Sequence, residues 1–170
     1  CPRALDLHQA LIFSSNEYFH QVIDLLGEQK IKAYADKWAF FPFPIPKGWL
    51  KQGLHSAIWG GALRLTPEDQ HRFMVRLARG DLLMTPAARE TLLRALTWPG
   101  SDQSMQLIGK TGSMQKVVWF TGFRRQGAET TVVTICLKGP VSLRTRAIGL
   151  FYSRFGLKWE EKLLASLEKK

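Results

Sequence analysis

The sequence predicts an α+β domain in which an antiparallel sheet is flanked by helices. Apolar residues recur at helical spacing through most of the first half, three β-branched segments then follow closely, and the last apolar stretch returns to helical spacing. Helices, then adjacent strands, then a returning helix is an α+β element order. With 170 residues and 45% hydrophobic content, the chain can bury one sizeable core, so we expect a single domain over residues 1–170.

The first part of the chain is expected to be helical. A break at Ser14-Ser15-Asn16 and a terminating Gly27 separate its apolar periodic segments. Prolines alternate with apolar residues over 41–46, which predicts an extended, packed loop, whereas 54–65 is ambiguous. The predicted helices are 5–13, 17–26 and 28–38.

Two further helices carry clear start signals. Thr66-Pro67-Glu68-Asp69 supplies an N-cap, a proline at the first helical position and two acids that complement the helix dipole. This helix is expected to end at Gly80. Thr85-Pro86 is a second N-cap followed by proline, and it starts a helix that stops before Pro99.

The second half carries the sheet. The segment 125–129 has the length of a hairpin turn between two of its strands. The predicted strands are 105–111, 116–124 and 130–138, and the predicted closing helices are 142–155 and a short amphipathic one at 158–168.

The net charge of +10 does not by itself identify a partner. The basic residues are dispersed, with adjacent pairs only at Arg124-Arg125 and Lys169-Lys170, and neither zinc-ligand spacing nor a helix-turn-helix glycine pattern accompanies them. We therefore predict no nucleic-acid partner; an acidic polymer or an anionic envelope fits the charge equally well. No apolar run reaches the roughly 20 residues of a membrane span. The start, Cys1-Pro2-Arg3, lacks a signal-peptide pattern, so we expect upstream sequence or, alternatively, a mature lipoprotein cysteine.

The cysteines and histidines predict no cofactor and no metal. Two cysteines do not make a disulfide framework, and the four histidines share no metal-binding spacing. Cys136 lies in the alternating run 131–137, so a buried, inert strand thiol is expected.

Lys110-Thr111-Gly112 is the first candidate site, because it lies at the end of a predicted strand. Lys110 supplies charge, Thr111 supplies a hydrogen-bond donor, and Gly112 lets another backbone approach closely. Together they can hold the carboxylate of a peptide end. A solvated lysine beside a turn glycine is the alternative explanation.

Ser14-x-Asn16 is the second candidate, at a break between two helices. Both side chains can project from that loop into a cleft, or they can be ordinary helix caps. The two motifs occur in the order in which Ser-x-Asn and Lys-Thr-Gly accompany Ser-x-x-Lys in penicillin-binding proteins and class A β-lactamases. That order favours a shared site.

On these residues the chain resembles the C-terminal portion of a penicillin-binding transpeptidase domain, close to the class D β-lactamases. The similarity covers most of the chain, and the resemblance implies a β-lactamase/transpeptidase-like fold. The matching segments are 5–11 with 14–19 around the second motif, 63–70 with Phe73, Leu77, 80–82 and 85–88 before the third, and Gly109-Lys110-Thr111-Gly112 with 119–123 as a strand pair.

The resemblance also implies roles in acyl transfer through a serine ester. Ser14 would relay a proton, and Asn16 would hydrogen-bond the substrate amide. Lys110 and Thr111 would grip the carboxylate of a D-alanyl peptide or a β-lactam, and the backbone N–H of Ser113 would be an oxyanion-hole donor. The ligand would lie along the 105–112 strand as an added strand.

The sequence departs from the family in two respects. The Ser-x-x-Lys motif that supplies the nucleophile should lie well upstream of Ser14, and the strings at 113–116 and 166–169 do not begin a buried helix. Class D enzymes usually have valine where Asn16 stands, which favours a penicillin-binding protein.

These departures predict an N-terminally incomplete domain whose nucleophile lies outside this chain. The family's N-terminal strands would pair beside 130–138, so we expect a missing segment or another chain to complete the sheet. The expected ligand is a peptidoglycan stem peptide or a β-lactam, the expected location is periplasmic or extracytoplasmic, and a membrane would be reached only through a segment absent here. The alternative function is a non-catalytic sensor of β-lactam or peptidoglycan, or a degenerate paralogue.

Overall fold

The computed structural model describes residues 4–42, 44–45, 48–49, 64–114 and 116–165. Its strands form one antiparallel sheet in the order β1-β2-β3. The elements are α1 (Leu7–Ile12), α2 (Asn16–Lys37), α4 (Pro67–Arg79), α5 (Pro86–Ala95), β1 (Met105–Met114), β2 (Val117–Gln126), β3 (Glu129–Lys138), the 3-10 turn η1 (Val141–Leu143), α6 (Arg144–Ser153) and α7 (Lys162–Ala165).

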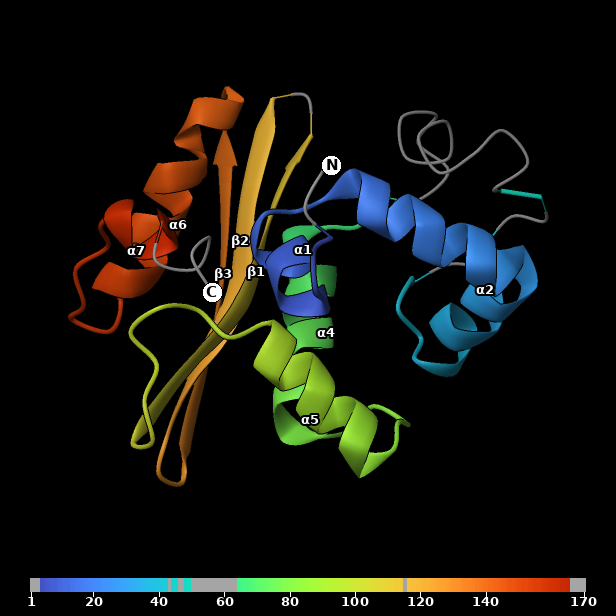
Figure 1. Cartoon of the computed structure of the whole chain (residues 1–170), viewed down its shortest axis with the longest axis horizontal. Coiled ribbons are helices and arrows are strands. Elements are labelled where there is room, and N and C mark those ends of the chain that lie inside the picture. The colour runs from blue at the N-terminus through green and yellow to red at the C-terminus, as the bar shows by residue number, and fades with distance from the viewer. Residues whose placement is uncertain (1–3, 43, 46–47, 50–63, 115, 166–170) are drawn as a thin grey trace.

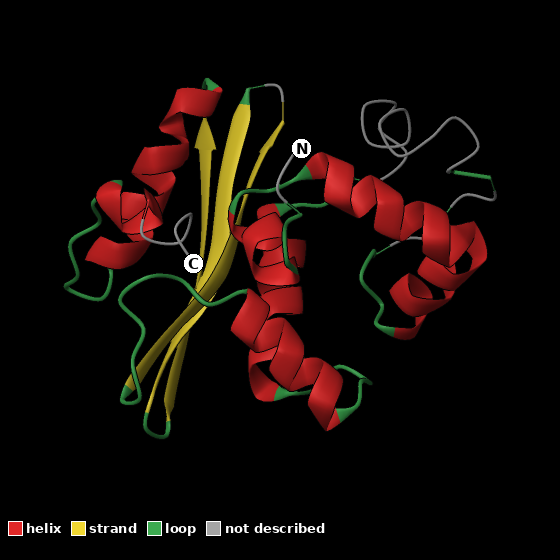
Figure 2. Ribbon diagram, viewed as in Figure 1, coloured by secondary structure: helices red, strands yellow, loops and turns green. Residues whose placement is uncertain are grey.

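Helices cover both faces of the sheet. Figure 1 shows α6 and α7 on one face and α1, α4 and α5 on the other, with α2 extending away from the sheet. Figure 2 shows the same arrangement, with red helices on either side of the yellow strands. The α+β class and the antiparallel sheet predicted from the sequence are confirmed.

The local signals act as predicted. Thr66 and Asp69 form a reciprocal capping box at the start of α4, and Gly80 ends that helix in the left-handed conformation at φ 85°. Gly27 has φ 75° and ψ 160°, so two helical segments meet there within α2. Gln126 pairs with Glu129, which leaves a two-residue hairpin loop.

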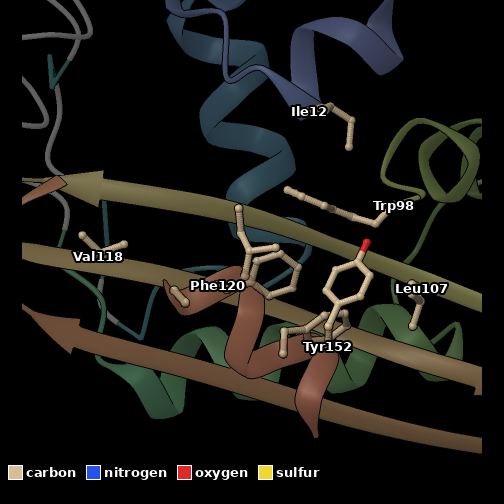
Figure 3. Packing of buried hydrophobic residues seen from close by; sticks show 9 residues of the cluster. Ile12, Trp98, Leu107, Val118, Phe120 and Tyr152 are labelled. Atoms are coloured by element: carbon tan, nitrogen blue, oxygen red, sulfur yellow. The ribbon is translucent and has the colours of Figure 1, made fainter. Parts of the chain in front are cut away.

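The core has two clusters, one on each face of the sheet, because successive strand side chains point to opposite faces. On the α6 face Trp98, Phe120 and Tyr152 lie close together (Figure 3). The ring centroids of Trp98 and Phe120 are 5.1 Å apart, and those of Phe120 and Phe151 are 4.3 Å apart. The cluster on this face includes Ile12, Trp98, Leu107, Val118, Phe120, Phe151 and Tyr152. The cluster on the α4 face includes Met74, Leu77, Leu82, Leu93, Leu96, Ile108 and Phe123.

Two glycines let β1 and β2 accommodate the large aromatic core. Gly109 lies opposite Gly122, and a Cβ on Gly109 would lie 2.7 Å from the Phe120 ring. A Cβ on Gly122 would lie 2.3 Å from the carbonyl oxygen of Ile108. The indole nitrogen of Trp98 donates to the carbonyl oxygen of Gly109 at 2.8 Å, which ties the chain before β1 to the strand.

The prediction of a buried thiol at Cys136 is wrong. Cys136 is exposed because β3 is an edge strand of the described sheet. Partial burial, and secondarily the charge of Glu68, raise the pKa of its thiol.

Some predicted segments are shorter or lie outside the described residues. The helix expected over 158–168 contains α7, and residues 166–170 are outside the described part. In the proline-rich loop Ile45 is buried, as expected for packed chain. The ambiguous segment falls outside the described residues over 54–63.

We predict that Gly122→Ala lowers the free energy of unfolding by about 1–3 kcal/mol, because the new methyl group meets backbone that cannot yield. Gly112→Ala is the matched control in β1, where the nearest atom to the added Cβ would be 3.8 Å away. Chemical denaturation measures both variants. Equal effects from the two substitutions would contradict the proposed close approach.

Candidate functional site

Ser14 lies in the turn between α1 and α2, held by a tightly packed first helix. Ala10 and Ile12 of α1 are buried, and the Nδ1 atom of His8 lies 3.0 Å from the carbonyl oxygen of Ala95 at the end of α5. Ser14 itself has φ 56°, a left-handed conformation that is uncommon outside glycine. Ser15, rather than Ser14, caps α2 by accepting from the amide of Tyr18. The Ser14 hydroxyl is therefore not used as a helix cap.

Strand β1 brings Lys110 and Thr111 to this hydroxyl. The Lys110 Nζ atom donates to Ser14 Oγ and also to the carbonyl oxygen of Thr111 at 2.8 Å. Thr111 Oγ1 lies 3.5 Å from Ser14 Oγ, at the limit of hydrogen bonding. The two motifs predicted to share a site thus meet across about half the length of the chain.

Arg144 is a fourth member of the cluster, which sequence reasoning missed. Its Nη2 atom lies 3.3 Å from Ser14 Oγ and 3.3 Å from the carbonyl oxygen of Ile12. Arg144 is the first residue of α6, where a cation opposes the helix dipole. That unfavourable position is the one signal in the sequence that could have marked it.

The cluster is electropositive. Burial, and secondarily the charge of Arg144, lower the pKa of Lys110 to about 8. Burial also lowers the pKa of Arg144. Among the described residues, neither cation forms an ion pair with a carboxylate. Two cations beside two hydroxyls, with no carboxylate partner among the described residues, have the charge and the donors to accept an anion such as a carboxylate.

The outer edge of β1 is open beside this cluster. The amide of Gly109 donates to the carbonyl oxygen of Leu96, and that of Trp98 donates to Leu107, so this edge is covered up to Gly109. Hydrogen-bonding directions alternate along a strand, which turns the backbone N–H of Thr111 and Ser113 to the same side. No described residue accepts from these two amides. An extended ligand can therefore pair with the strand at this position.

The other predicted site residues make no side-chain hydrogen bond to the described members of the cluster. Asn16 is exposed at the first position of α2. Gly112 and Ser113 are exposed on β1, opposite Trp119 and Val118. Ser113 belongs to strand β1, and the Ser-x-x-Lys string at 166–169 lies outside the described residues.

The described residues contain neither a metal-binding cluster nor a membrane-spanning helix. No group of three or more metal-ligating side chains gathers among them. None of their helices has the length and hydropathy of a membrane span.

This sheet, with its flanking helices, is the β-lactamase/transpeptidase-like fold. Similar solved structures are class D β-lactamases, so the resemblance drawn from the sequence is confirmed for the fold. The enzyme from Bacillus subtilis matches with a TM-score of 0.69 and 18% identity over 94% of this chain and 69% of its own. FUS-1 (OXA-85) from Fusobacterium nucleatum subsp. polymorphum matches with 0.70 and 17% over 89% and 62%. OXA-427 matches with 0.68 and 20% over 95% and 72%.

Sequence comparison adds no closer relative: no protein-family model and no curated protein matches the chain. At the identities above, structural similarity shows the fold alone.

We predict that the depressed pKa of Lys110 makes stability depend on pH. Between its folded pKa of about 8 and its ordinary value of 10.5, the unfolded chain binds more protons than the folded chain. The free energy of unfolding should therefore rise with pH across this window, by up to about 3 kcal/mol, relative to a Lys110→Met variant. Urea denaturation of both proteins from pH 7 to 11 measures the difference, in which other titrating groups cancel. Parallel curves would contradict a buried, charged Lys110.

Proposed function

We propose that this chain supplies the ligand-binding part of a penicillin-binding, serine acyl-transferase domain, of the D,D-transpeptidase or β-lactamase type. Its nucleophilic serine would lie outside these 170 residues. The observation that carries the proposal is the meeting of the Ser14 hydroxyl with Lys110 and Arg144, two cations without carboxylate partners, beside the open edge of β1.

The anionic end of the ligand would be held by the cluster. Arg144 presents a guanidinium fork suited to a carboxylate, and Lys110 adds a second charge. The Thr111 hydroxyl would donate a hydrogen bond to the same group. A D-alanyl peptide and a β-lactam both carry such a carboxylate, and the peptide-like backbone would pair with the outward N–H groups of β1.

Ser14 and Lys110 would also move a proton. When the external serine attacks the ligand carbonyl, the C–N bond breaks and the leaving nitrogen needs a proton. Ser14 Oγ can donate that proton and recover one from Lys110 Nζ, to which it is hydrogen-bonded. A pKa of about 8 suits Lys110 to this exchange near neutral pH. Asn16, exposed at the start of α2, would hold the ligand amide, and the Ser113 N–H would stabilise the oxyanion.

We also propose where the protein acts and what completes its sheet. Peptidoglycan lies outside the cytoplasm, so the protein would act in the periplasm or the extracytoplasmic cell envelope. An N-terminal segment or another chain would complete the sheet along the edge strand β3.

A non-catalytic sensor is the second candidate function. It is favoured by the absence, from the described residues, of a Ser-x-x-Lys string at the start of a buried helix. The cluster would then bind a β-lactam or a stem peptide reversibly and signal its presence.

A fluorescent penicillin reporter distinguishes the two functions in the protein extended upstream of Cys1. A covalent adduct that survives denaturation and maps to a serine supports acyl transfer. Saturable binding with no adduct supports the sensor, and no binding at all overturns both.

We predict that Arg144→Gln weakens binding of a carboxylate-bearing β-lactam to this chain by about tenfold or more, because the anion loses its guanidinium partner. Arg146→Gln, an exposed residue of the same helix, removes the same charge and should have little effect. Binding to the unaltered chain should also weaken as pH rises past about 8, where Lys110 loses its charge. Calorimetric titration tests all three expectations. An equal loss of β-lactam affinity in the two arginine variants would contradict a direct role of Arg144 in binding.

A further inference from the structure

A second basic site lies apart from the Ser14 cluster. A cavity of about 710 Å³ opens between α5, the end of α4 and the strands β1 and β2, and no residue of the Ser14 cluster lines it. Its apolar wall includes the buried side chains of Leu82, Leu93 and Ile108. Its charged wall consists of Arg79, Arg89, Arg94 and Arg125, against the single acid Glu90.

The two inner arginines leave most of their donors unused. Arg89 Nη2 donates to the carbonyl oxygens of Leu77 at 3.4 Å and Ala78 at 3.1 Å, and Arg125 Nη2 donates to that of Ala78 at 3.2 Å. Arg89 Nε is buried and has no partner. A guanidinium carries five N–H donors, and a buried donor without a partner is costly. The carbonyl oxygens at the end of α4 therefore accept from only some of the N–H donors of Arg89 and Arg125.

Positive charge at the cavity is not balanced. No described carboxylate forms an ion pair with any of the four arginines. Burial, and secondarily the charge of Arg89, lower the pKa of Arg125, so the two guanidinium groups repel each other. A bound oxyanion would relieve this repulsion and supply acceptors for the unused donors.

We propose that this cavity binds an organic phosphate, that is, an apolar group bearing a phosphate monoester or a diphosphate. Four arginines against one glutamate match a dianion better than a single carboxylate. The apolar wall accounts for the organic part, and the volume is within the range of small-molecule sites. The proposal does not depend on the acyl-transfer function, because the two sites share no residue.

Calorimetric titration of the 170-residue chain with phenyl phosphate tests this inference. We expect this cavity to bind phenyl phosphate saturably, and at least about tenfold more tightly than it binds benzoate or inorganic phosphate. A double variant, Arg79→Gln with Arg94→Gln, removes two exposed arginines that have no side-chain partner among the described residues, so folding should be retained. Its affinity for phenyl phosphate should fall by about tenfold or more.

The matched control is Arg146→Gln with Arg154→Gln, which removes the same charge from exposed positions outside the cavity. It should bind as the unaltered chain does, and so should Lys110→Met. No saturable binding, equal losses in the two double variants, or loss in Lys110→Met alone would overturn the proposal. Benzoate binding that is as tight as that of phenyl phosphate, and that is lost in the Arg79→Gln with Arg94→Gln variant, would overturn the assignment to phosphates.

Discussion

The aromatic core over Gly109 and Gly122 is the constraint on which the candidate site depends. Trp98 donates its indole N–H to the Gly109 carbonyl, and the Phe120 ring fills the space that two side chains would otherwise occupy. This arrangement sets the pairing of β1 with β2 one residue before Lys110. A slip of one residue would turn Lys110 to the opposite face, away from Ser14. The packing of the large aromatic rings therefore determines that the Lys110 side chain faces Ser14.

Backbone carbonyls, rather than described carboxylates, accept from Lys110 and Arg144 in one cluster and from Arg89 and Arg125 in the other. Lys110 donates to the carbonyl of Thr111, Arg144 to that of Ile12, and Arg89 and Arg125 to that of Ala78. A carbonyl satisfies a donor but does not cancel its charge. Both clusters therefore keep their positive charge in the folded protein and can attract an anion. Part of the net charge of +10 lies in these two clusters.

Local chemistry made much of the fold predictable. Local signals act through the neighbouring backbone and can therefore be predicted from the sequence. Examples are the cap at Thr66, the left-handed helix end at Gly80 and the break at Gly27. The pairing of Ser14 with Lys110 was predictable from motif order and family resemblance. Cys136 was misjudged because an alternating strand pattern does not say whether the strand lies at the edge of the sheet.

The helices, the hairpin, the fold class and the two polar motifs can be predicted from the amino-acid order, because each depends on spacing within a short segment or on motif order. Folding brings particular members of the 24 lysines and arginines together without a described acid between them, and that choice is visible only in three dimensions. Arg144 joins Ser14 across 130 positions, and Arg125 joins Arg89 through a carbonyl of α4. Electrostatic interaction depends on distance in space and on burial, and neither is written in the spacing of residues along the chain.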